Sequence, residues 1–154
     1  MNRRKGFTLI ELLVVIGILA VLLAITLIAV NPAKNIEDAE DTQRKSDVTQ
    51  ILNAVSQFIV DNNGQPPSGV PSGAVGTEVA IGDATGEANI CAALVPTYIA
   101  AIPQDPDTGG NGIDETECTA GSYITQYEIR ELNGRVTVSA PNANSGPGTI
   151  EVTR

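Results

Sequence analysis

Histidine is absent from the 154 residues of this sequence, so the side chain that serves most often as a catalytic base is missing. Nucleophilic sites built on a Ser–His or Cys–His pair are therefore excluded. The 18 acidic residues show no spacing that singles out a catalytic dyad, and the glycines lie in Ser-, Pro- and Asn-rich loops. We expect a protein that is not an enzyme.

Basic and aromatic residues are also scarce. Nine Lys and Arg stand against 18 Asp and Glu, which gives a net charge of −9, and only two Phe and three Tyr are present. A nucleic-acid surface needs cations for the phosphates, and single-strand binding also uses aromatic side chains for base stacking. We therefore expect no nucleic-acid partner, and the low cation content disfavours acidic partners in general.

One long apolar run dominates what is present. It extends over the 24 residues from Phe7 to Val30, in which only Thr8, Glu11 and Thr26 are polar. A helix of that length spans ~36 Å, enough to cross a bilayer core of ~30 Å. A secretory signal peptide fits poorly, because its apolar core is only about 7–15 residues long and no A-x-A site closes this run.

Charged residues flank and interrupt this run. Arg3, Arg4 and Lys5 precede it, and such cations stay cytoplasmic, which places the chain after Val30 outside the membrane. Glu11 lies inside the run, where a charge costs ~2.5–3.5 kcal/mol at the bilayer centre, so it is a candidate functional residue.

The segment Lys5-Gly6-Phe7-Thr8-Leu9-Ile10-Glu11-Leu12 resembles the processing site of type IV prepilins and type II secretion pseudopilins. The resemblance implies that a prepilin peptidase cuts between Gly6 and Phe7 and methylates the new amino group of Phe7. Residues 1–6 are then a leader peptide and residues 7–30 a transmembrane and assembly helix. The resemblance extends to residues 44–67 and 94–106, where Tyr98-Ile99 and Ile102-Pro103-Gln104-Asp105-Pro106 are similar to the family's "YL..IP.DP" segment.

Glu11 lies one helical turn after Phe7, on the same face. In a helical filament its carboxylate can pair with the amino group of a neighbouring subunit, which offsets the cost of the charge and fixes the register. The family's tip pseudopilin lacks this carboxylate, so Glu11 favours an ordinary subunit. The alternative is a plain membrane anchor in which Glu11 snorkels to the headgroups.

The exported part, residues 31–154, is predicted to be one domain. Asn31-Pro32 indicates either a kink in one long helix or a short break. An amphipathic helix follows within residues 31–63, with its polar half, Lys34 to Lys45, expected away from the core and with Asp47 on its polar face. The apolar positions recur at i, i+3, i+4 and i+7 and comprise Val48, Ile51, Leu52, Val55, Phe58 and Ile59.

Residues 64–154 are predicted to form a globular region of loops and a small sheet. A short strand is expected near Glu78–Ile81 and a short helix over Glu87–Val95. Ser122 to Ala140 alternates as a hairpin around Asn133-Gly134, a strong signal for a tight turn, and Thr149–Thr153 adds an edge strand. The expected fold is α+β and type IV pilin-like, with a long N-terminal helix packed on a small antiparallel sheet.

Cys91 and Cys118 are the only cysteines. Outside the membrane an even pair favours a disulfide, and two free thiols are the alternative. Zinc is disfavoured, since two cysteines without histidine do not complete a tetrahedral site.

An acidic loop between these cysteines carries oxygen ligands that suit calcium, namely Asp105, Asp107, Asn111 and Asp114. Their spacing is not that of an EF-hand. Major pseudopilins are similar in having a calcium site in this region, while the alternative is a solvated turn, in which Asp, Asn and Gly are common for backbone reasons. The cofactor prediction is none, with calcium as the candidate.

The resemblance implies a structural subunit of a type IV pilus or type II secretion pseudopilus. Its partners are then other copies of itself in a helical filament, the prepilin peptidase, the assembly machinery and, before assembly, the membrane. The protein is expected as a single-pass cytoplasmic-membrane protein with its N-terminus inside, and then in an extracytoplasmic or cell-surface filament. The alternatives are a minor pilin acting in adhesion or DNA uptake, and a membrane-anchored exported domain that does not polymerise.

Overall fold

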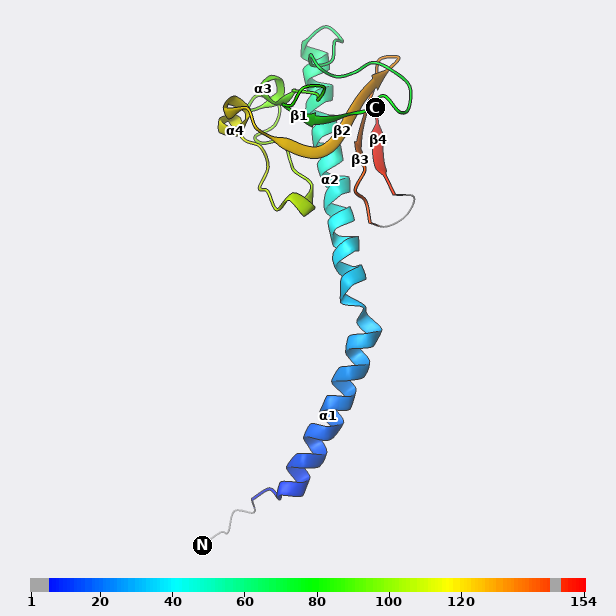
Figure 1. Ribbon diagram of the computed structural model, residues 1–154, viewed down its shortest axis with the longest axis vertical. Coiled ribbons are helices and arrows are strands. Elements are labelled where there is room, and N and C mark those ends of the chain that lie inside the picture. The colour runs from blue at the N-terminus through cyan, green and yellow to red at the C-terminus, as the bar shows by residue number, and fades with distance from the viewer. Residues whose placement is uncertain (1–5, 145–147) are drawn as a thin grey trace. The chain divides into compact units, whose positions relative to one another are not determined.

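The computed structural model describes residues 6–144 and 148–154, which divide into two compact units, Met1–Ile36 and Glu37–Arg154 (Figure 1). The long N-terminal apolar helix and the small antiparallel sheet confirm the predicted α+β, pilin-like architecture. Arg3, Arg4 and Lys5 of the expected leader peptide lie outside the described residues.

The first unit is mainly helix α1, Leu9–Val30. Asn31 follows in the left-handed conformation, at φ 40° and ψ 75°, and helix α2 begins at Pro32. Proline disfavours the α region for the residue before it, and asparagine tolerates the left-handed region better than most residues. Of the two alternatives left by the sequence, the structure has the short break.

Helix α2 is Pro32–Asp61, and its part from Glu37 onward belongs to the second unit. There it accompanies a four-stranded sheet in the order β1-β2-β3-β4, with every neighbouring pair antiparallel (Figure 1). The strands are β1 Val79–Gly82, β2 Ile124–Leu132, β3 Arg135–Ala140 and β4 Ile150–Thr153. Asn133 and Gly134 turn the β2–β3 hairpin with φ of 54° and 78°, as an Asn-Gly turn requires. The predicted hairpin and edge strand are confirmed.

Side chains from α2 and from the sheet make one core. The predicted stripe of α2 supplies Val48, Ile51, Leu52 and Val55, each at most 1% exposed, and Phe58 and Ile59 pack at its margin. The inward face of β2 contributes Tyr127 and Ile129, both fully buried. This core fixes the second half of α2 against the sheet.

Three short helices connect these elements: α3 Cys91–Leu94, the 3-10 turn η1 Pro106–Thr108, and α4 Glu115–Ala120. The predicted helix over 87–95 is thus only four residues long. Helix α4 was not predicted from the sequence. It begins at a capping box in which Asp114 accepts the amide N–H of Glu117, and the Glu117 carboxylate accepts that of Asp114.

The polar half of α2 departs from expectation. Asp41 and Arg44 are at most 1% exposed, and Asp47 is 5% exposed, although the sequence placed all three outside the core. The unit Glu37–Arg154 is the head of the molecule. The prediction was wrong because each of these three side chains hydrogen-bonds a polar partner inside the head. Polar groups can be buried when they are hydrogen-bonded or ion-paired.

Candidate functional site

The predicted cleavage site lies just before α1. Gly6 and Phe7 are exposed and belong to no helix or strand, and the Phe7 side chain is 85% exposed. Because α1 begins only at Leu9, the peptide bond between Gly6 and Phe7 takes part in no helical hydrogen bonding. The structure therefore leaves this bond accessible to a peptidase.

Thr8 and Glu11 cap the start of α1 reciprocally. The amide of Glu11 donates to Thr8 Oγ1 at 3.3 Å, and Glu11 Oε2 accepts from the amide and the hydroxyl of Thr8, both at 3.4 Å. This capping box turns the Glu11 carboxylate back toward the N-terminal end of the helix, where it binds the amide of Thr8, the residue that follows Phe7. Thr8 was missed as a functional residue, although its signal, a Thr three residues before a Glu ahead of an apolar run, is in the sequence.

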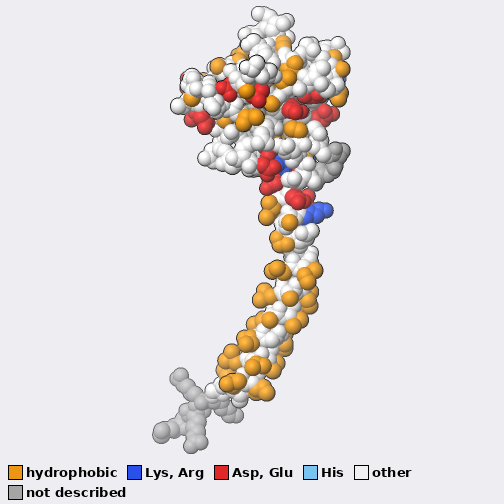
Figure 2. All heavy atoms as spheres, in the orientation of Figure 1, with side chains coloured by type: hydrophobic (Ala, Val, Ile, Leu, Met, Phe, Trp, Pro, Cys, Tyr) orange, Lys and Arg blue, Asp and Glu red, His pale blue; other side chains and the backbone are white. Residues whose placement is uncertain are grey.

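The side of α1 is apolar and uncovered. Its side chains are exposed over residues 9–29, and Figure 2 shows apolar side chains distributed along the helix. By length and composition, Leu9–Ala29 is one helix that could cross a membrane. An apolar surface of this size needs lipid or another protein around it.

Inside the head, Arg44 of α2 joins the start of the acidic loop. Its Nε donates to Asp105 Oδ2 at 2.9 Å, and its Nη2 donates to Asp105 Oδ1 and to Asp107 Oδ2, both at 3.0 Å. The Arg44 and Asp105 side chains are both fully buried, whereas that of Asp107 is 53% exposed. The hydrogen bond to Asp105 raises the pKa of the Arg44 guanidinium above its already high ordinary value, against the opposing effect of burial.

The same arginine reaches a second loop through Asp41. Arg44 Nη1 donates to Asp41 Oδ1 at 2.9 Å, and the amide of Asn144 donates to that same oxygen, also at 2.9 Å. Glu40 accepts from the side-chain amide of Asn144 at 2.9 Å. One cation therefore ties α2 to the loop before α4 and, through Asp41, to the loop after β3.

Asp47 forms a separate buried contact with the sheet. The Tyr127 hydroxyl donates to Asp47 Oδ2 at 2.8 Å. Burial raises the pKa of the Asp47 carboxyl, and the hydrogen bonds from Tyr127 and Gln43 lower it in part. Burial, together with the neighbouring Asp47, also raises the pKa of the Tyr127 phenol. No proton-transfer partner among the described residues gives this pair a catalytic arrangement, and we treat it as structural.

Cys91 of α3 and Cys118 of α4 are joined by a disulfide across a sequence separation of 27 residues, with their Cα atoms 5.5 Å apart. The predicted pairing is present in the structure. It closes the segment that contains the acidic loop and holds α3 and α4 together.

Three of the four residues predicted as calcium ligands already have hydrogen-bond partners in the structure. Asp105 and Asp107 bind Arg44, while Asp114 Oδ1 accepts the amides of Thr116 and Glu117 as the cap of α4. Asn111 lies exposed in the loop between them. Among the described residues, which include all four, no group of three or more Asp, Glu, Cys or His side chains is placed to hold a metal ion.

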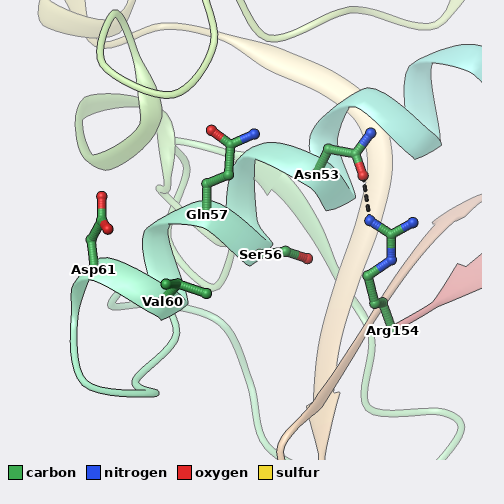
Figure 3. A pocket seen from close by; sticks show the side chains of 6 residues that line it. All are labelled: Asn53, Ser56, Gln57, Val60, Asp61 and Arg154. Atoms are coloured by element: carbon green, nitrogen blue, oxygen red, sulfur yellow. Dashed lines mark hydrogen bonds between the residues drawn. The ribbon is translucent and has the colours of Figure 1, made fainter.

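A hollow of about 410 Å³ lies along the second half of α2. Figure 3 shows the side chains that line it, which are Asn53, Ser56, Gln57, Val60, Asp61 and Arg154. Arg154 donates from Nη1 to Asn53 Oδ1 across one end. Its lining is mostly polar and lacks a nucleophile with an adjacent base, so it suggests no reaction.

Comparisons with known proteins agree with these observations. The family model of the prokaryotic N-terminal methylation motif matches residues 1–27. The chain is 32% identical over 105 residues to type II secretion system core protein G of Aeromonas hydrophila, an alignment that covers 68% of each chain. It is 33% identical over 104 residues to the protein of the same name from Pectobacterium carotovorum subsp. carotovorum, covering 68% of this chain and 62% of that one. No solved structure matches the chain significantly.

The chain belongs to the type II secretion system core protein G family. This is a family of pilin-like structural subunits, the pseudopilins, and not of enzymes. Together with the apolar helix Leu9–Ala29, membership makes the chain a membrane-anchored pseudopilin.

Proposed function

We propose that this chain is a polymerising subunit of a type II secretion pseudopilus or a type IV pilus. A prepilin peptidase cuts it between Gly6 and Phe7 and methylates Phe7, and copies then assemble through α1. The observation that carries the proposal is the uncovered apolar α1 with a carboxylate at its start, directly after an exposed, non-helical Gly6–Phe7 bond.

The proposed mechanism depends on what cleavage does to charge. Removing residues 1–6 takes away three cations and creates an amino group at Phe7. Before assembly, the capping box with Thr8 satisfies part of the hydrogen-bonding capacity of Glu11. In a filament, Glu11 pairs with the amino group of a neighbouring copy, which offsets the cost of a carboxylate in an apolar environment and sets the axial register.

Orientation and partners follow from the same residues. Arg3, Arg4 and Lys5 keep the N-terminus cytoplasmic, so the head is exported. The partners are further copies of the chain, the peptidase and the secretion or pilus machinery that extracts subunits from the membrane. The name shared by the two relatives supports the type II secretion system as that machinery.

Intact mass of the protein in sheared surface material of the native cells tests processing. We expect a chain that starts at Phe7, carries one added methyl group and lacks two hydrogens because of the Cys91–Cys118 bond. A chain that still begins at Met1 and occurs only in the membrane fraction would contradict the proposal and leave a membrane-anchored domain.

Glu11→Ala tests assembly, with Glu37→Ala as a matched control. Glu37 is an exposed carboxylate of α2, outside the apolar run. We expect Glu11→Ala to reduce the sheared fraction at least tenfold with unchanged amounts in the membrane, and Glu37→Ala to leave both fractions unchanged. Equal surface fractions for the two variants would refute a role for Glu11.

A minor pilin for adhesion or DNA uptake remains the second prediction. The ratio of this chain to the other pilin-like subunits in purified filaments separates the two, because a bulk subunit is abundant there and a minor one is scarce.

A further inference from the structure

The acidic loop contains the ligand types that a pseudopilin calcium site requires, but its first carboxylates are already bound to a cation. Asp105 receives Nε of Arg44 on Oδ2 and Nη2 on Oδ1, at 2.9 and 3.0 Å. Its Oδ1 also accepts the amide of Asp107 at 3.0 Å. A metal ion at Asp105 would have to displace a guanidinium that is itself fully buried.

The geometry of Arg44 resembles that of a bound ion. Asp41, Asp105 and Asp107 surround its guanidinium at 2.9–3.0 Å, and Glu40 lies at 3.9 Å. Asp41 and Glu40 belong to α2 itself, whereas Asp105 and Asp107 come from the loop, 61 and 63 residues further along the chain. The arginine therefore makes the cross-link between helix and loop that a metal ion makes elsewhere.

The remaining buried polar atoms already have hydrogen-bond partners. Asp114 is engaged as the cap of α4. In the part of the chain that the structure describes, every buried side-chain nitrogen and oxygen has a hydrogen-bond partner. A vacated metal site of carboxylates would instead leave buried oxygens without donors.

We propose that Arg44 is the internal cation of this head and takes the place of a loop-bound calcium ion, so that the head folds and keeps its stability without calcium. A covalently attached guanidinium is not lost by dilution or chelation, whereas extracellular calcium sites bind with dissociation constants of about 10⁻⁴–10⁻³ M and empty when calcium is scarce. This proposal concerns the head alone and does not depend on cleavage at Gly6 or on polymerisation.

The first test is thermal unfolding of the wild-type full chain in detergent, followed by near-ultraviolet circular dichroism in 1 mM CaCl₂ and in 1 mM EDTA. We expect midpoints that agree within about 1 °C, because the head needs no calcium. A midpoint that rises saturably with calcium concentration overturns the proposal, whatever the variants below do.

The second test compares Arg44→Gln with Lys45→Gln. Both remove one positive charge from adjacent positions of α2, but Lys45 is exposed and has no ion pair with a described residue. We expect Arg44→Gln to lower the midpoint by more than about 10 °C, because it leaves the carboxylates around it without their cation and two of them are buried. We expect Lys45→Gln to change the midpoint by less than about 2 °C. Equal effects of the two substitutions overturn the proposal.

Arg44→Lys is a second test variant, which keeps the proposal testable if Arg44→Gln does not fold. An ammonium keeps the charge but cannot present the planar fork that donates to three carboxylates. We expect a midpoint clearly below wild type and still independent of calcium. A midpoint equal to wild type shows that the guanidinium cross-link is not what holds the loop and overturns the proposal.

Discussion

Replacing Tyr127 by Phe removes one hydrogen-bond donor from the core and leaves the aromatic ring in place. The lost hydroxyl donates to Asp47 Oδ2 at 2.8 Å, and the residues themselves are 0% and 5% exposed. Water therefore cannot replace the bond freely, and Gln43 is left as the other side chain that lowers the pKa of Asp47. The substitution isolates one buried hydrogen bond to a carboxylate.

A hydrogen bond to a charged group contributes about 1.5–3 kcal/mol. We therefore expect Tyr127→Phe to lower the free energy of unfolding at pH 7 by about 2 kcal/mol. The measurement is urea unfolding of the full chain in a nonionic detergent, followed by circular dichroism. Tyr98→Phe is the matched control: the Tyr98 hydroxyl hydrogen-bonds Asp61, whose side chain is exposed to solvent, so its removal should destabilise the protein clearly less than Tyr127→Phe does.

The pH dependence gives the sharper test. Burial raises the pKa of Asp47 in the folded protein, and the Tyr127 bond opposes that rise, so Tyr127→Phe raises the pKa further. A carboxyl whose pKa is higher folded than unfolded binds more protons in the folded state, so its contribution to stability increases as pH falls through the folded pKa toward the ordinary value of about 3.9. The variant gains more than wild type in this window.

The difference in stability between wild type and Tyr127→Phe should therefore shrink as the pH falls from 7 toward the ordinary carboxyl pKa of about 3.9. Contributions from the other carboxylates cancel, because the two proteins share them. A difference that stays constant, or grows on acidification, would refute the reasoning that Asp47 is ionised and stabilised by Tyr127 at neutral pH.

Two further substitutions test the packing and the cross-link of the head. Leu52→Ala, at a position 1% exposed, should cost about 2–5 kcal/mol in urea unfolding; a loss below 1 kcal/mol would show that the α2 stripe is not the core contact. Cys118→Ser should cost about 3 kcal/mol by releasing the 27-residue connection to Cys91, and wild type treated with reductant should match it; unequal losses would mean that the serine acts by some route other than opening the disulfide.

Local patterns in the sequence were enough for most of the architecture. The stripe from Val48 to Ile59 predicts the buried face of α2, and the alternation on either side of Asn133-Gly134 predicts β2 and β3. Both signals repeat with the period of the element that they form, so no knowledge of distant residues is needed. The same holds for the break at Asn31, which depends on the adjacent proline.

The burial of Arg44 and Asp47 could not be predicted from local patterns in the sequence. Nothing near Arg44 in the sequence indicates that its partners lie 61 and 63 residues away, and an isolated arginine on a helix is normally exposed. Asp47 is a similar case, because its partner Tyr127 is on the sheet, 80 residues on. Burial of a charge is decided by tertiary pairing, which a single sequence does not display.

Asp114 shows how one residue type supports two interpretations. In the sequence it counts as a calcium ligand, because carboxylates are what that ion prefers. In the structure it is the N-cap of α4, with Glu117 three residues later completing a capping box. The Asp-x-x-Glu spacing was available in the sequence and predicts the helix, so this miss came from giving composition more weight than spacing.

The distribution of charge limits where filament cohesion can come from under the proposed function. Of the six cations left after cleavage, Arg44 and Arg130 are buried in ion pairs, and the carboxylates of Asp41, Asp47 and Asp105 are buried as well, so the exposed surface of the head keeps a large excess of acidic residues (Figure 2). Heads of one sign repel one another at distances within the Debye length of about 8 Å. The apolar side of α1 is exposed over residues 9–29, and in a filament the α1 helices of neighbouring copies would cover it. Under the proposed function, lateral contact in a filament therefore comes mainly from α1, and Glu11 sets its register. Salt screens the repulsion between neighbouring heads.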